Sequence, residues 1–182
     1  MKWERFAFLP HIASETTPPE VIQRVAEKIA PLGWHTDLYF LPQNYDIMEP
    51  LIKALPTPII IDHMGRPDVN VPVEQNAYFQ SLLKLGASRN DIFWKITSPD
   101  RYTRSARPED WQIVLPFAHS LVAAFPGNCL NGTDRPRPAG PPQCPRDVHV
   151  GPRLAKGNSR ELRPDRLLEG SPRRLQRQVE SD

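Results

Sequence analysis

The sequence predicts an α/β protein with a parallel β-sheet, and three observations support this fold class. Short strand-like segments alternate with longer helix-like segments through the first 134 residues. The strand-like segments contain continuous apolar runs, which are typical of parallel strands covered on both faces. Polar and charged residues follow these segments directly, at the positions where parallel strands end on one side of a sheet.

Five segments have the aromatic and β-branched composition expected of strands. They are Trp3–Leu9, Trp34–Phe40, Pro58–Asp62, Asp91–Thr97 and Asn128–Asp134. Four segments between them have the apolar periodicity of helices. These are 17–33, 45–55, 73–87 and 108–127. Pro50 is expected to interrupt or restart the second helix, and Pro116 divides the last segment into two.

The spacing of about 30 residues per repeat fits the βαβ unit. A β/α barrel and a doubly wound sheet both collect the carboxyl ends of their strands at one face or edge. Periodicity alone does not separate the two architectures, so both stay open at this point.

Candidate functional residues occupy these strand ends. His63 and Arg66 follow the third strand, with Gly65 between them to permit a turn that other residues resist. The remaining candidates are Arg5 within the first strand, His11 after that strand, and Tyr39, Arg101 and Asp134 near later strand ends. His63 has the alternative of a structural hydrogen-bonding residue, and Tyr39 that of a core residue. Asp134 has the alternative of a helix cap, and Arg101 that of a solvated loop charge. Arg5 differs, because an arginine that points inward from a barrel strand is rare unless it binds a ligand.

The combined chemistry of these residues favours hydrolysis of an anionic ester or lactone. A carboxylate acts as a base, a histidine polarises a carbonyl group and arginines bind anionic groups. The sequence contains no GxGxxG, Walker, HExxH or GxSxG motif, so those chemistries gain no support.

The chain changes composition after Asp134. Through Asp134 it has 12 Lys and Arg against 15 Asp and Glu, whereas the last 48 residues have 11 against 6, with 8 Pro. No Phe, Tyr, Trp, Ile or Met follows Phe125, so this segment has little apolar surface to bury. A basic arm for nucleic acid, a disordered tail and an out-of-frame translation of a GC-rich gene all fit. We favour the last of these.

Cys129 and Cys144 form no CxxC or metal-ligand pattern, which favours free thiols in a reducing compartment. No run approaches the ~20 apolar residues of a membrane span, and the first residues lack the features of a signal peptide. We therefore expect a cytoplasmic protein with a small-molecule partner, no membrane association and no nucleic-acid partner. Its oligomeric state stays open.

The stretches "RFAF", "GWHTDLYF", "PIIIDHMGRPDV", "FWKITSPDRYT" and "GTDRPRP" together resemble the amidohydrolase-related (amidohydrolase 2) family. Within it they are most similar to lactonases of 2-pyrone-4,6-dicarboxylate. The resemblance covers roughly residues 3–138. It implies a partial TIM-like (β/α)8 barrel comprising strands four to eight, because the HxH motif of the family's first strand is absent. We therefore expect a partial barrel over 1–138 and a disordered Arg- and Pro-rich tail over 139–182.

The resemblance implies a role for each candidate residue. Asp134 matches the base that activates water, and His63 matches the histidine that polarises the lactone carbonyl. Arg5, Tyr39, Arg66 and Arg101 match or adjoin substrate-binding positions, and His11 replaces a family arginine. Arg135 and Arg137 replace a tryptophan and a histidine of the family motif.

The implied function is hydrolysis of a small anionic lactone without a metal, although related members use a divalent metal such as zinc. Two alternatives stay open: a family decarboxylase, and a truncated or frameshifted chain without enzymatic activity.

Overall fold

A computed structural model describes residues 3–8, 17–103 and 108–131 of the 182-residue chain. These residues contain five strands in one parallel sheet, ordered β1-β2-β3-β4-β5. The strands are β1 (Trp3–Ala7), β2 (His35–Tyr39), β3 (Ile59–Ile61), β4 (Ile92–Ile96) and β5 (Cys129–Asn131). All five strands predicted from the sequence are confirmed, and β2, β3 and β4 are each shorter than the predicted segment by one residue at either end.

Helices connect successive strands. They are α1 (Pro19–Ile29), α2 (Tyr45–Ala54), α3 (Ala77–Ala87), α4 (Asp100–Thr103) and α5 (Leu115–Ala124). A 3-10 segment, Pro108–Val114, precedes α5, so the predicted division near Pro116 is confirmed. Pro116 occupies the first turn of α5, where its missing N–H has no helical partner to lose.

The sequence interpretation was wrong at two places. Helix α2 continues through Pro50, because Met48, Leu51 and Ile52 bury its apolar face against the sheet and hold the helix together. Helix α4 was read as a loop from "TSPDRYT", and four residues are too short for helical periodicity to be detected. Arg101 therefore lies on a short helix.

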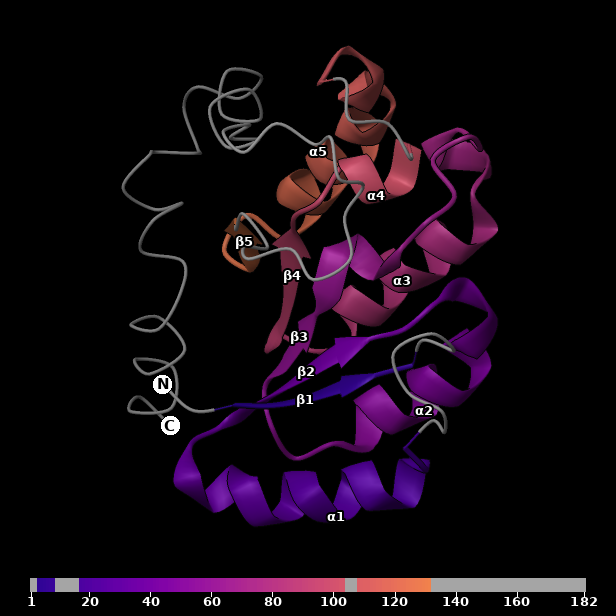
Figure 1. The fold of residues 1–182 in the computed structure, drawn as a ribbon. Helices are drawn as coiled ribbons and strands as arrows, with labels where there is room; N and C mark the ends of the chain where they lie inside the picture. The colour runs from indigo at the N-terminus through magenta and orange to yellow at the C-terminus, as the bar shows by residue number, and fades with distance from the viewer. Residues whose placement is uncertain (1–2, 9–16, 104–107, 132–182) are drawn as a thin grey trace.

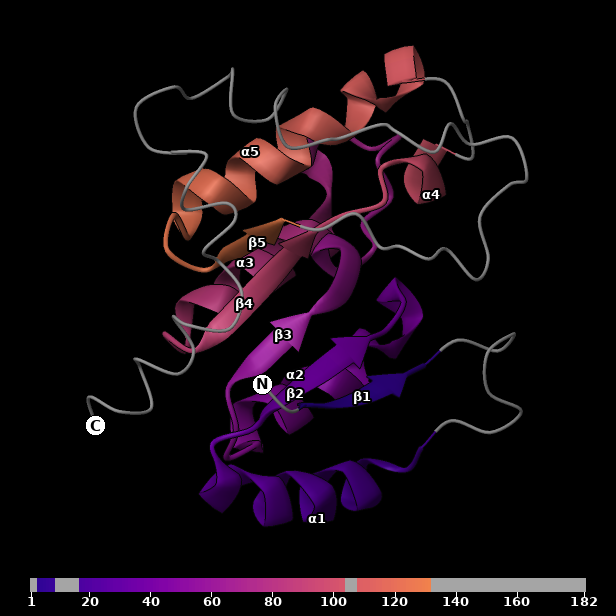
Figure 2. The ribbon, with the colours of Figure 1, turned by 60° about the vertical axis from the view of Figure 1, so that its left-hand side comes forward.

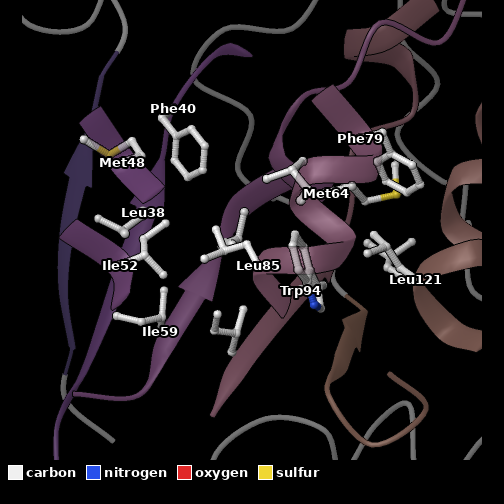
Figure 3. Close-up of a cluster of buried hydrophobic side chains, with 14 of the residues drawn as sticks. Leu38, Phe40, Met48, Ile52, Ile59, Met64, Phe79, Leu85, Trp94 and Leu121 are labelled. Carbon is white, nitrogen blue, oxygen red and sulfur yellow. The ribbon is translucent and has the colours of Figure 1, made fainter. Parts of the chain in front are cut away.

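Helices α1, α2, α3 and α5 cover one face of the sheet, as both views show (Figures 1 and 2). Alternate strand residues point toward them, since side chains in a strand alternate between faces. Leu38, Ile59 and Trp94 thereby join the main core with helical residues such as Ile52, Leu85 and Leu121 (Figure 3). This apolar layer fixes the register of every strand and so decides which side chains face the other way.

The opposite face of the sheet carries most of the charged strand residues. Arg5, Asp37 and Lys95 lie on this face, and they contact Asp62 or one another across the strands. A small second apolar cluster of Ile60, Phe93 and Leu130 lies beside them. In a β/α barrel the helices form an outer ring, so the sheet face without helices points into the barrel.

The strand order bears on the two architectures that periodicity left open, a β/α barrel and a doubly wound sheet. A doubly wound sheet reverses its strand order at a switch point and has helices on both faces. Here the order follows the sequence and the connecting helices share one face. The described part of the chain is therefore compatible with a segment of a TIM-like barrel. The assignment of its strands as four to eight stays a prediction.

The predicted tail, residues 139–182, and the predicted frameshift near residues 128–140 fall wholly or largely outside the described residues. Within those residues, none of the helices combines the length and the apolar character that a membrane crossing requires.

Candidate active site

Polar residues from four strands meet at the carboxyl-terminal edge of the sheet. Parallel pairing places Arg5 of β1 beside Asp37 of β2, two residues before Tyr39. Asp62 and His63 directly follow β3, and Thr97 directly follows β4. Because the strands run in one direction, their ends lie at a common edge, as the sequence predicted.

His63 begins a short left-handed turn. The φ angles of His63, Met64, Gly65 and Arg66 are 49°, 51°, 72° and 59°. Left-handed backbone costs a non-glycine residue roughly 1–2 kcal/mol, so three such residues among four consecutive ones are a strained arrangement. Strain of this kind persists where surrounding contacts over-determine it, and it is concentrated at functional sites.

The glycine of this turn has no space for a side chain. A Cβ atom on Gly65 would lie 2.6 Å from Cδ1 of Leu82, on helix α3. The turn is therefore packed closely against α3, and the predicted role of Gly65 in permitting it is confirmed by its positive φ.

The imidazole of His63 is held from two sides. Its Nδ1 lies 2.6 Å from Oγ1 of Thr97, and either atom can be the donor. The ring of Tyr39 contacts it edge-on, with 4.8 Å between ring centroids. His63 is only 2% exposed, so this histidine has one defined orientation at the end of β3.

Arg66 joins the same group of side chains. It donates from Nη1 to the Tyr39 hydroxyl over 3.3 Å, and its guanidinium lies 5.5 Å from the centroid of the Tyr102 ring. Arg66 and Arg101 also line one cleft of about 650 Å³ beside the carboxyl ends of β3 and β4. Asp68, Asp110 and Tyr102 contribute to its walls. The cleft is of a size that suits a small-molecule ligand.

Arg5 is paired with Asp62 and lies over the Tyr39 ring, 5.9 Å from its centroid. Its side chain is 43% exposed, whereas that of Asp62 is 1% exposed. Lys95 contacts Asp62 over 2.9 Å and Asp37 over 2.5 Å. The two buried carboxylates are thus neutralised by two cations from β1 and β4.

Burial and neighbouring charge shift the pKa values of this network. Burial raises the pKa of Asp37, and Asp62 adds to the rise, although Lys95 opposes it. Burial alone would lower the pKa of Lys95, but the charges of Asp62 and Asp37 outweigh it and raise that pKa. His35, 3.6 Å from Asp37, has its pKa lowered to about 4 by burial and by Lys95.

The structure brings most of the predicted residues together. Arg5, Tyr39, His63 and Arg66 form one contact group, and Arg101 shares the cleft with Arg66. His11 and Asp134 lie outside the described residues. The catalytic and substrate-binding roles of all seven residues stay predictions.

Sequence reasoning missed Asp37, Lys95 and Thr97. Asp37 and Lys95 occupy positions within strands whose alternate residues are apolar, as in "HTDLY" and "IFWKI", and Thr97 directly follows the second of these strands. A charged residue at alternating spacing inside a buried strand was the available signal, because such a charge requires a partner across the sheet.

The residues do not fit a divalent metal in the described part of the chain. No group of three His, Cys, Asp or Glu side chains converges there. The two carboxylates on the polar face, Asp37 and Asp62, are already paired with Lys95 and Arg5. We derive no chemical step through a metal.

A family model described as Amidohydrolase matches residues 5–175. The chain belongs to the amidohydrolase family. The predicted resemblance is therefore confirmed, and the match extends past Pro138.

Two curated members of the family illustrate the similarity. A 2-pyrone-4,6-dicarboxylate hydrolase from Comamonas testosteroni is 34% identical in an alignment of 144 residues, and the match covers 74% of this chain and 45% of the relative. A 4-sulfomuconolactone hydrolase from Rhizobium radiobacter is 34% identical over 132 residues, 72% of this chain and 43% of the relative. This amidohydrolase chain spans about half the length of these relatives.

Solved structures share the fold. A probable 2-pyrone-4,6-dicarboxylic acid hydrolase from Acinetobacter baumannii, with citric acid bound, gives a TM-score of 0.58 at 21% identity, covering 74% of this chain and 49% of that one. A zinc-bound amidohydrolase from Burkholderia multivorans gives 0.54 at 17% identity, covering 63% and 42%. At these identities the likeness supports the fold alone.

Proposed function

We propose that this amidohydrolase chain hydrolyses a small lactone that carries carboxylate or sulfonate groups. One observation carries the proposal: His63 and two arginines, Arg5 and Arg66, converge on Tyr39 at the carboxyl-terminal edge of the sheet. A histidine among arginines suits a carbonyl substrate with anionic substituents. The names of the two 34%-identical relatives support the same substrate class.

In the proposed reaction a water oxygen attacks the lactone carbonyl carbon. Asp134 accepts the proton of that water, and His63 donates a hydrogen bond to the carbonyl oxygen as negative charge develops on it. The bond between the carbonyl carbon and the ring oxygen then breaks. The ring oxygen leaves as an alkoxide or enolate and takes the proton from Asp134, so the product is an open-chain carboxylic acid that contains every atom of the lactone and the water. The acid then releases a proton to solvent and becomes a carboxylate.

In this proposal the contact between His63 and Thr97 determines which nitrogen of the His63 imidazole carries the proton. When the Thr97 hydroxyl donates to Nδ1, the imidazole carries its proton on Nε2, which is then a donor for the carbonyl oxygen. Arg66 and Arg101, which line the cleft, bind the anionic substituents and orient the ring.

The direct test is turnover of both lactones by the full chain. 2-Pyrone-4,6-dicarboxylate and 4-sulfomuconolactone are offered separately, loss of the lactone absorbance is followed, and the product is identified by a mass gain of one water. His63→Gln and Asp134→Asn should each lower kcat by roughly 100-fold or more. His119→Gln, on the exposed face of α5, is the control and should leave turnover unchanged.

Two outcomes contradict the proposal. Release of carbon dioxide without ring opening assigns the chain to decarboxylation. Absence of turnover of either lactone by the folded chain supports the alternative of a chain without enzymatic activity.

A further inference from the structure

The left-handed turn His63–Arg66 carries two of the proposed site residues, yet its backbone conformation is unfavourable for three of its four members. Within the turn, one backbone hydrogen bond runs from the Arg66 N–H to the His63 carbonyl over 2.9 Å. A single internal bond does not account for a defined conformation of this kind, so contacts from outside must contribute.

Two tyrosine hydroxyls supply such contacts. Tyr102 of α4 donates to the carbonyl of His63, and Tyr78 of α3 donates to the carbonyl of Gly65 over 2.5 Å. The two carbonyls belong to the first and third residues of the turn. The turn is therefore held from two helices, by tyrosines that are 24 positions apart in the sequence.

The aromatic rings contribute as well. The guanidinium of Arg66 lies over the ring of Tyr102. The Tyr78 hydroxyl lies 3.4 Å from the position that a Cβ atom on Gly65 would occupy. Burial raises the pKa of both tyrosines above its ordinary value, so both hydroxyls remain protonated donors at physiological pH.

We propose that Tyr78 and Tyr102 are positioning residues, which clamp the left-handed turn so that His63 and Arg66 are presented together at the end of β3. The claim that the two tyrosines hold the turn is supported by the contacts of the turn. The claim that they position residues for catalysis rests on the proposed lactone hydrolysis, because His63 and Arg66 act on substrate only in that proposal.

Phenylalanine variants test the clamp, since they remove each hydroxyl and keep each ring. The variants are Tyr78→Phe and Tyr102→Phe, each measured in the full chain. Tyr45→Phe is the matched control: its hydroxyl donates to the carbonyl of Ser81 over 3.0 Å and not to a residue of the turn, although its ring contacts Tyr78.

Backbone amide exchange is the readout that does not depend on turnover. We expect exchange in the peptide containing residues 62–67 to accelerate by about five- to tenfold in each clamp variant, which is the effect of losing one hydrogen bond. Tyr45→Phe should leave that peptide unchanged. Unchanged exchange in both clamp variants, or equal acceleration in Tyr45→Phe, overturns the proposal.

A comparison at Tyr102 separates positioning from simple packing. Tyr102→Phe keeps an aromatic face under Arg66, so we expect kcat to fall about tenfold while KM changes less than twofold. Tyr102→Leu removes that face too, and KM should then rise as well. If the two variants show the same fall in kcat and the same change in KM, the assigned role is contradicted.

The outcomes keep the two proposals distinguishable. If the wild-type chain opens neither lactone, the proposed function fails and amide exchange still decides whether the clamp exists. Circular dichroism shows whether each phenylalanine variant folds. If one of them does not, amide exchange in the other variant decides whether the clamp exists.

Discussion

The carboxylate of Asp62 is ion-paired with the guanidinium of Arg5 across the intervening strand β2. Asp62 directly precedes His63, so this pair links the first strand to the turn that carries the proposed catalytic histidine. Lys95 reaches the same carboxylate from β4, on the other side. One buried acidic group thereby joins three strands beneath the candidate site.

Asp62→Asn should destabilise the fold, because two cations lose the carboxylate that compensates them. We expect the free energy of unfolding to fall by roughly 1–3 kcal/mol. The loss is limited because Lys95 keeps its ion pair with Asp37 and the partly exposed Arg5 side chain stays in contact with solvent. Urea denaturation measures the change. Glu49→Gln removes the exposed pair with Lys53 and should cost less than about 0.5 kcal/mol. Equal effects of the two substitutions would show that the Asp62 network contributes no more than a surface pair.

Thr97→Val should impair turnover more than stability. It removes the hydroxyl that contacts Nδ1 of His63, and with it the control of the imidazole tautomer. We expect kcat for lactone opening to fall about tenfold, with a loss of roughly 1 kcal/mol in the free energy of unfolding.

Thr57→Val is the matched control for this substitution. It breaks the buried contact between the Thr57 and Thr36 hydroxyls, 2.7 Å long and remote from His63. A similar loss of stability with unchanged kcat is expected. If both variants lose the same fraction of kcat, Thr97 acts through general stability alone.

Gly65→Ala should disrupt the turn for two reasons that can be separated. Its positive φ is unfavourable for alanine, and the new Cβ would meet Leu82. Gly33→Ala carries a similar φ of 65° at an exposed helix end, so it reports the backbone cost of roughly 1 kcal/mol. Thermal or urea unfolding should show a larger loss for Gly65→Ala, by about 1 kcal/mol or more. Equal losses would mean that Leu82 shifts freely.

His35 predicts an acid sensitivity of the fold. Its pKa is lowered to about 4 from 6.5, so between these pH values the unfolded chain binds a proton that the folded chain excludes. Stability must therefore fall as pH decreases through this window, by up to about 3 kcal/mol. His35→Gln should flatten the slope of unfolding free energy between pH 7 and pH 4. An unchanged slope in His35→Gln would contradict the assignment.

The strand and helix pattern was accessible from the sequence because apolar periodicity reflects burial directly. All five strands were predicted, and the predicted bounds of β2, β3 and β4 were too long by one residue at each end. Helix α4 was missed because four residues carry no period, and the break expected at Pro50 did not occur because tertiary packing outweighs the local cost of proline.

The sequence by itself determined the α/β class, the family and the placement of His63, Arg66, Tyr39 and Arg5 near strand ends. These features depend on local patterns and motifs, which are formed by residues that are close to one another in the sequence. Only the tertiary structure decided that the sheet follows sequence order with its helices on one face, and that Asp62 joins Arg5 to Lys95. It also decided that Tyr78 and Tyr102 hold the turn of "DHMGR". These contacts join residues dozens of positions apart, and only the packing of the helices on the sheet brings such residues together.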